Sequence, residues 1–249
     1  MGFLSFGKPW KNVILAALVI GVGGYGLFWL RRASAPQVLG LAVREVKTTQ
    51  RVMALTFDDG PHPQATREIL ALLKQHDAKA TFFVVGQHAQ TYPEIIQEIY
   101  RDGHELGNHS WDHRHLIYHR PSFVRSQIEA TDQLLRHLGY PGPIPFRAPY
   151  GHKLFVLPYV LWQSQRPHIL WSIELEDWDS PPPAEMLAKF DQEAGPGKIL
   201  LLHDGCIGQP QSREATTRLL ALILEKYRAL GYEFVTISGL LKIGGMADG

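Results

Sequence analysis

The chain has little cysteine, no surplus of either charge and no nucleotide-binding fingerprint, and each absence narrows its function. Its 249 residues include one cysteine, Cys206, which excludes an internal disulfide and a zinc site built from several thiolates. The net charge is +1, without the basic excess typical of nucleic-acid binding proteins. Gly21-Val22-Gly23-Gly24 lies inside an apolar run and not between a strand and a helix, so no nucleotide cofactor is expected.

The N-terminus combines an apolar run with basic flanks. Residues 13–30 carry no charge, and a helix over them would be roughly 27 Å long, close to the thickness of a bilayer's hydrocarbon core. The first 35 residues contain four bases (Lys8, Lys11, Arg31 and Arg32) and no acid. We expect residues 1–35 to form a transmembrane signal anchor that leaves the rest of the chain outside the cytoplasm. A signal peptide cleaved after Ala35 and a buried soluble helix are the alternatives.

From Arg51 onward, short apolar segments alternate with segments of helical period. Strands are predicted at 52–57, 80–85, 104–107, 144–146, 168–173, 198–202 and 233–237. Helices are predicted at 64–76, 93–102, 121–138, 154–165, 183–194 and 212–230. This alternation is typical of parallel strands covered by helices, in a closed barrel or an open doubly wound sheet. We therefore expect a linker over 36–50, one α/β domain over 51–242 and a tail over 243–249.

Reactive side chains follow the predicted strands. The residues in this position are Asp58, Asp59, His109, Arg147, Glu174, Glu176, Asp177, His203 and Asp204. Carboxyl ends of parallel strands meet at one face, which is where βα-barrels place their active sites. The pattern therefore predicts one site assembled from several strand ends.

Asp58 and Asp59 are adjacent at the end of the first strand. Neighbouring carboxylates repel each other unless a cation or a proton lies between them. Because adjacent strand residues point to opposite faces, one could bind a metal while the other faces a substrate. Taken alone, the pair also fits a solvated turn, since Asp and Gly are common turn residues.

The segment His109-Ser110-Trp111-Asp112-His113 places two imidazoles four residues apart. On a helical turn both would face the same side and could reach one ion. His115 and His119 have the same spacing and offer a second register. Together with Asp59, the first pair gives an Asp-His-His set with open positions, which suits a catalytic zinc. Two histidines and one carboxylate are also the iron ligands of non-haem iron oxygenases. Paired carboxylates are also the catalytic residues of glycosidases.

Five motifs, TFDDG, HSWDH, FRAPYG, EDW and LLLHDG, occur along the chain. In order and spacing they resemble those of the polysaccharide deacetylases of the NodB-homology type, carbohydrate esterase family 4. The resemblance covers residues 51–238. It implies a distorted (β/α)-barrel of about seven strands, one divalent metal ion, and removal of acetyl groups from N- or O-acetylated glycans.

The resemblance also implies roles for the motif residues at the metal. Asp58 would be the general base, and Arg147 would orient it. The metal ligands would be Asp59, His109 and His113. Zinc is the expected ion, with cobalt, nickel or manganese as alternatives.

The remaining motif residues are expected to transfer the second proton and hold the substrate. His203 would be the general acid, held by Asp177. The residues expected at the substrate are Tyr150, through its backbone N–H, Trp178 and Pro149. Glu174 departs from the family pattern, which usually has Asp at that position.

The expected substrate is N-acetylglucosamine in peptidoglycan or a related surface polysaccharide. The anchor favours a polymer of the wall or surface over a diffusible oligosaccharide. An O-deacetylase of xylan-like polymers and an inactive, membrane-anchored glycan-binding domain are the alternatives.

Overall fold

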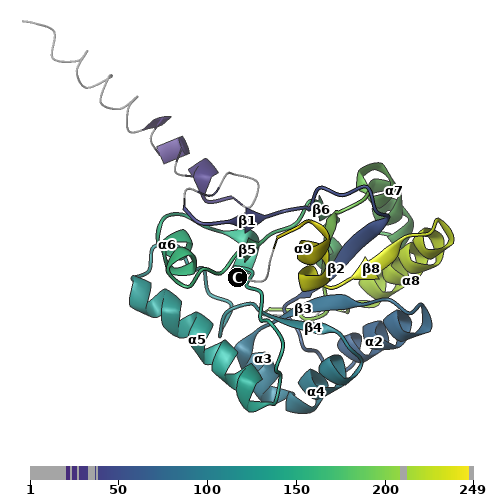
Figure 1. Ribbon diagram of the computed structural model, residues 1–249, viewed down its shortest axis with the longest axis horizontal. Coiled ribbons are helices and arrows are strands. Elements are labelled where there is room, and N and C mark those ends of the chain that lie inside the picture. The colour runs from purple at the N-terminus through teal and green to yellow at the C-terminus, as the bar shows by residue number, and fades with distance from the viewer. Residues whose placement is uncertain are drawn as a thin grey trace, which may run out of the picture.

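The computed structural model describes residues 21–22, 24–26, 28–32, 37, 39–207 and 212–246. Parallel strands form its centre, and helices surround them (Figure 1). The described elements are, in chain order, β1 (Ala42–Val43), β2 (Val52–Asp58), α2 (Ala65–Gln75), β3 (Ala80–Val84), α3 (Gly86–Thr91), α4 (Pro93–Arg101), β4 (Glu105–Asn108), α5 (Pro121–His137), η1 (Pro149–Gly151), α6 (Val156–Gln163), β5 (His168–Ile169), β6 (Ile173–Glu174), η2 (Asp177–Asp179), α7 (Pro183–Glu193), β7 (Ile199–His203), α8 (Glu214–Ala229), β8 (Glu233–Val235) and α9 (Ile237–Ile243).

Strand β2 is the centre of the sheet. The strand order is β4-β3-β2-β7-β6, and β8 also pairs with β2. Every ladder is parallel, and single bridges through Phe146 continue from Asn108 of β4 to His168 of β5. The predicted parallel α/β fold is confirmed. Across the described ranges, no ladder joins β5 or β1 to β6, so closure of the barrel stays a prediction.

The predicted strands and helices are present, with differences that have local causes. Helix α3 was not predicted because it is short and lacks an apolar stripe. The strand predicted at 233–237 ends at Val235, since the Thr236 side chain accepts a hydrogen bond from Gly239 N–H and starts α9. The strand predicted at 144–146 is reduced to a bridge at Phe146, and the one at 168–173 is divided into β5 and β6.

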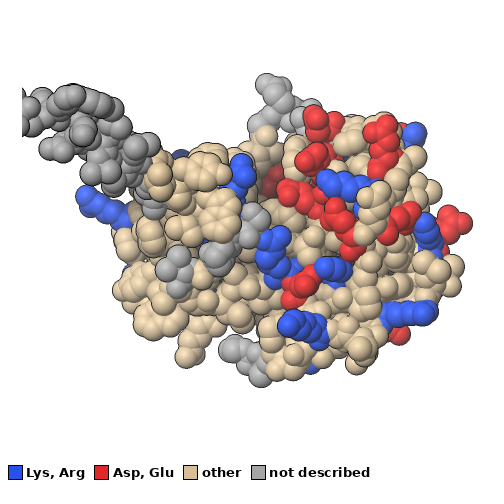
Figure 2. Space-filling model, turned by 90° about the horizontal axis from the view of Figure 1, so that it is seen from above, with Lys and Arg blue, Asp and Glu red and all other residues tan. Residues whose placement is uncertain are grey.

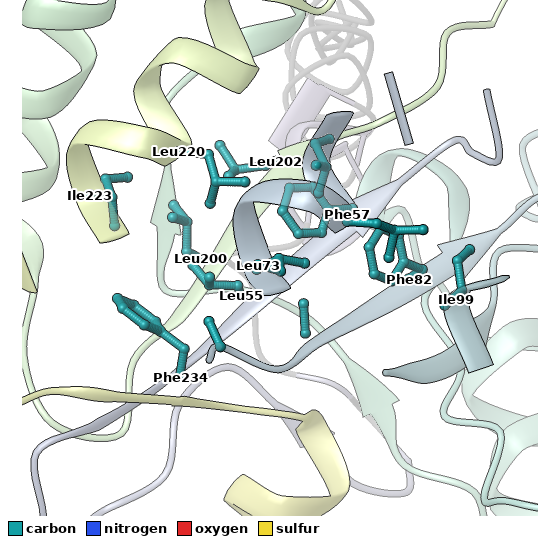
Figure 3. Packing of buried hydrophobic residues seen from close by; sticks show 14 of the residues in the cluster. Leu55, Phe57, Leu73, Phe82, Ile99, Leu200, Leu202, Leu220, Ile223 and Phe234 are labelled. Atoms are coloured by element: carbon teal, nitrogen blue, oxygen red, sulfur yellow. The ribbon is translucent and has the colours of Figure 1, made fainter. Parts of the chain in front are cut away.

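Successive side chains along β2 and β7 point alternately to two faces of the sheet, one facing the apolar core and the other facing the candidate site. Leu55 and Phe57 point toward the helices and pack with Leu200 and Leu202 in the main apolar cluster, which α2 and α8 cover (Figure 3). The intervening residues point to the other face. Asp58 and His203 are among them, and the β2–β7 register makes them direct partners.

Apolar side chains fill the opposite end of the strands. Ile237 and Leu240 of α9 pack in one cluster with Val52 and Ala54, near the start of β2. The carboxyl ends of the strands are thereby left for polar side chains.

Part of the predicted linker belongs to the folded domain. Strand β1 pairs with β5, and Val43 and Val46 are buried in the interior apolar cluster. A segment that buries apolar side chains and pairs with a strand packs on the domain, while the boundary at residue 50 stays a prediction.

The described residues include no helix that is long and apolar enough to cross a membrane. The predicted span at 13–30 lies largely outside those residues. The anchor therefore stays a prediction, as does the C-terminal tail, of which 247–249 also lie outside the description.

Charged side chains gather on one half of the face seen in Figure 2, where acidic and basic groups are intermixed. The other half of that face carries few charges. Intermixed charges largely cancel at a distance, so this face attracts neither polyanions nor polycations by its long-range field.

Candidate active site

Both carboxylates at the end of β2 face one cavity of about 430 Å³. Asp58 is the last residue of the strand and points inward by alternation. Asp59 follows with a φ of 73°, in the left-handed region that aspartate tolerates better than most residues. The expectation that the two side chains point to opposite faces is wrong, because this backbone turn ends the strand alternation and brings both to the same cavity.

His109 and His113 reach Asp59 from a loop. Residues 109–113 form no helix, and Ser110 and His113 have φ values of 67° and 58°. The Nε2 atoms of His109 and His113 lie 3.5 and 3.1 Å from Asp59 Oδ1. The predicted trio is therefore brought together, while the predicted helical turn is wrong. Asn108 shapes the loop instead, since its Oδ1 accepts a hydrogen bond from Ser110 N–H.

This trio fits a metal ion. One ligand atom from each residue lies within 4.8 Å of the others, and all three side chains are buried. Asp59 Oδ1 and His113 Nδ1 are also buried polar atoms without a hydrogen-bond partner in the described structure. Buried polar atoms are costly unless something pairs with them, and an ion at the centre of the trio would pair with the carboxylate oxygen. Carboxylate and imidazole are ligands that suit zinc and similar divalent ions.

The protonation states at the trio favour metal binding. Burial opposes ionisation of Asp59, but the two neighbouring imidazoles and the charge of His203 outweigh it and hold the pKa of Asp59 well below its usual value. Burial lowers the pKa of His113, which favours the neutral imidazole. An ionised carboxylate and a neutral imidazole are the forms that bind metal.

The alternative pair of histidines, His115 and His119, forms no metal-binding group among the described residues. The His119 ring stacks on Phe123 at 4.2 Å, and His115 stacks on Tyr150 at 4.0 Å. Neither histidine belongs to the metal-binding group found among the described residues.

Arg147 is fully buried and orients Asp58. Its Nη1 donates to Asp58 Oδ1 at 2.7 Å and to Thr56 Oγ1 at 2.8 Å. Its other nitrogens donate to the carbonyl oxygens of Ile169 and Leu170. The guanidinium is thus fixed from several sides, and the carboxylate has one orientation.

Glu174, at the position where Asp is usual, lies on β6 and lines the cavity. It takes no part in the hydrogen bonds that hold Arg147. The longer side chain therefore leaves the Arg147–Asp58 pair undisturbed.

His203 and Asp177 form a second charged pair. His203 Nδ1 lies 2.8 Å from Asp177 Oδ1, and His203 N–H donates to Asp177 Oδ2 at 2.9 Å. Thr216 of α8 also donates to Oδ2 at 2.8 Å. Burial lowers the pKa of His203, but the charge of Asp177 outweighs it and raises the pKa to about 9. The imidazolium therefore persists at neutral pH, as a general acid requires.

Replacing Asp177 with Asn should shift the alkaline limb of the activity profile to lower pH. If His203 has its expected role as general acid, this limb would reflect loss of its proton, and an opposite charge this close commonly shifts a pKa by about 1–3 units. The stabilisation that the His203–Asp177 pair gives the folded state is fully present below 6.5, the ordinary pKa of histidine. It is lost as the pH rises through about 9, the pKa of His203 in the folded state. Activity and thermal unfolding between pH 6 and 10 would measure both effects, with Thr216→Val as a control that keeps the charge. An alkaline limb at the same pH in Asp177→Asn would contradict this assignment.

Two aromatic residues line the cavity beside these pairs. The Trp178 ring meets His203 edge-on at 5.4 Å, and Tyr150 lies at the cavity with 49% of its area exposed. Tyr150 has a φ of 59°, and its N–H makes no hydrogen bond within the described part of the chain. Pro149 is buried in the same turn and does not line the cavity, so its expected contact with substrate stays a prediction.

Several residues that support the site were missed. Thr56 binds Arg147 from within the first motif, and its place two residues before Asp58 could have revealed it. Thr216 lies on helix α8 outside the motifs, and no pattern signals it. His88 of α3, whose Nδ1 lies 2.7 Å from Asp59 O, has no sequence signal that sets it apart from the other histidines. Asp204 is not among the missed residues, because it stands in the motif LLLHDG directly after His203; it is fully buried under Gly60, accepts from Thr66 at 2.6 Å, and has a pKa raised to about 7 by burial.

The chain is similar to known proteins in sequence. The family model for "Polysaccharide deacetylase" matches residues 45–160. A chitooligosaccharide deacetylase of Azorhizobium caulinodans is 39% identical over 171 residues, which cover 68% of this chain and 80% of that protein. A peptidoglycan-N-acetylglucosamine deacetylase of Bacillus cereus is 32% identical over 205 residues, covering 82% and 94%.

A solved structure shows the same fold. The crystal structure of the Bc1960 peptidoglycan N-acetylglucosamine deacetylase superposes with a TM-score of 0.74 at 30% identity, covering 79% of this chain and 91% of that one. From the site, the sequence relatives and this structure together, the chain belongs to the polysaccharide deacetylases of carbohydrate esterase family 4, the NodB-type hydrolases.

Proposed function

We propose that this chain is a metal-dependent hydrolase that removes acetyl groups from N-acetylglucosamine units of peptidoglycan or a related surface polysaccharide. One observation carries the proposal. Asp58 and His203, a carboxylate fixed by Arg147 and an imidazolium fixed by Asp177, are register partners beside the Asp59–His109–His113 group. A base, an acid and a metal-binding trio in one cavity are the parts that amide hydrolysis needs.

The metal-binding trio would hold one divalent ion, with zinc the expected one. When bound, such an ion polarises an acetyl carbonyl and makes a water more acidic. Asp58 would accept the proton of the attacking water, in the orientation that Arg147 sets. The unpaired N–H of Tyr150 would donate to the oxygen that becomes negative. His203 would give its proton to the departing nitrogen, and Asp177 would keep that imidazole protonated until then.

The relatives support the proposed substrate class. Relatives are named for chitooligosaccharide and for peptidoglycan N-acetylglucosamine, which share an N-acetylated hexosamine. We also infer that the apolar run at 13–30 anchors the chain with its catalytic domain outside the cytoplasm, where a wall polymer is accessible.

The test is acetate release by the full chain from peptidoglycan, chitin oligomers, poly-N-acetylglucosamine and acetylxylan. We expect release from the N-acetylated polymers, with loss of turnover after chelation and recovery on adding zinc. Release from acetylxylan alone would replace the proposal with O-deacetylation. New reducing ends without acetate would indicate a glycosidase, and glycan binding without any release would indicate an inactive domain.

A further inference from the structure

Three aromatic rings, one of which lines the cavity, pack against one another. His115 and Tyr150 lie 4.0 Å apart between ring centroids, with 20° between their planes. His115 and His152 are 5.1 Å apart at 18°, and Tyr150 and His152 are 5.6 Å apart at 34°. The Nδ1 atoms of His115 and His152 are 3.1 Å apart, so one imidazole donates to the other. The His115 ring is therefore nearly parallel to both others, and the Tyr150 and His152 rings are tilted against each other.

Tyr150 is the ring of this group that reaches the catalytic cavity. Tyr150 lines the cavity and also contacts the metal-binding group, its ring lying 4.7 Å from that of His113. His115 and His152 do not line the cavity, and His115 is exposed. A ligand unit lying on these two rings would thus be next to the unit whose acetyl group is inside the cavity.

The turn that carries two of the rings is fixed. Tyr150 and Gly151 both have left-handed φ values, near 60°, and Gly151 and His152 N–H donate to the carbonyls of Ala148 and Pro149. Lys153, which follows, is buried. Little side-chain or backbone freedom remains to be lost when a ligand binds, and such preorganisation favours affinity.

We propose that His115, Tyr150 and His152 form an aromatic platform that binds the sugar unit next to the one deacetylated. The proposal rests on the proposed function and specifies its substrate as an oligomer or polymer of hexosamines. One face of a pyranose presents C–H groups of partial positive charge, which complement the negative face of an aromatic ring.

Substrate length distinguishes a binding platform from a purely structural stack. The full chain and its His115→Ala and His152→Ala variants would be assayed on the pentamer of N-acetylglucosamine and on an aryl acetate too small to reach the platform. We expect kcat/KM for the pentamer to fall by about 2- to 10-fold in each variant, mostly through KM, with the aryl acetate rate unchanged. His115→Phe and His152→Phe keep a ring and should retain most of the pentamer activity.

The matched control is His119→Ala, an exposed histidine on the same loop whose ring stacks on Phe123. It should match the wild type on both substrates. Equal losses on the pentamer and the aryl acetate would show that the stack only supports the catalytic centre, and no loss on the pentamer would also overturn the proposal. If the wild type cleaves the aryl acetate and no glycan, the proposed function fails instead, so the two failures are distinguishable.

Discussion

Replacing Asp58 with Asn should lower kcat for glycan deacetylation by about 10²- to 10⁴-fold, the usual contribution of a positioned general base. An amide of the same size cannot accept the proton from water. The neighbouring metal-binding residues Asp59, His109 and His113 are unchanged, so the zinc content of the variant should match the wild type. Acetate release and metal analysis on the same preparation would measure both quantities.

The same substitution should also reduce stability, because Arg147 is fully buried and Asp58 is its charged partner at 2.7 Å. Removing one member of a buried ion pair typically costs about 3–5 kcal/mol, since the other charge is left uncompensated. Pairing Asp58→Asn with Arg147→Met removes that charge, so the double variant should lose less free energy of unfolding than the sum of the single losses. It should remain inactive. Recovery of activity with recovery of stability would show that Asp58 is structural and not the base.

Much of the site could be predicted from strand ends. Asp58 and His203 both follow apolar segments predicted as strands, so they were expected at the same end of the sheet before the β2–β7 register was known. Carboxyl ends of parallel strands meet at one face, which brought Asp177 and Arg147 into the same prediction. These inferences depend only on where strands end, and the pattern of apolar residues in the sequence predicts those positions.

The features of the site that were predicted wrongly or missed depend on loop backbone conformations, which leave no periodic pattern in the sequence. Left-handed φ values at Asp59, Ser110 and His113 set how the ligands converge, and none of these residues is glycine, the usual signal for that region. The four-residue spacing of the histidines suggested a helical turn, but the loop achieves the same convergence through Asn108. Supporting contacts between distant segments, such as Thr216 to Asp177, have no local signature at all.

Zinc should stabilise the chain, and His113→Ala should abolish that effect. A ligand present at 100 times its Kd stabilises the folded state by about 2.7 kcal/mol, which for a chain of this size raises Tm by about 5–10 °C. His113 supplies one of three clustered ligand atoms. We therefore expect metal-free wild-type protein to gain this shift when zinc is added, and His113→Ala to gain little and to lose activity by at least about 10²-fold.

Thermal unfolding reports metal binding without any turnover, so it tests the site independently of the substrate. His119→Ala removes a histidine of the alternative register and should keep the full zinc-dependent shift, because its ring lies on Phe123 and outside the metal-binding group. A shift lost in His119→Ala but kept in His113→Ala would assign the ion to the other pair of histidines. Iron in place of zinc in protein purified without added metal would favour the oxygenase chemistry that two histidines and a carboxylate also allow.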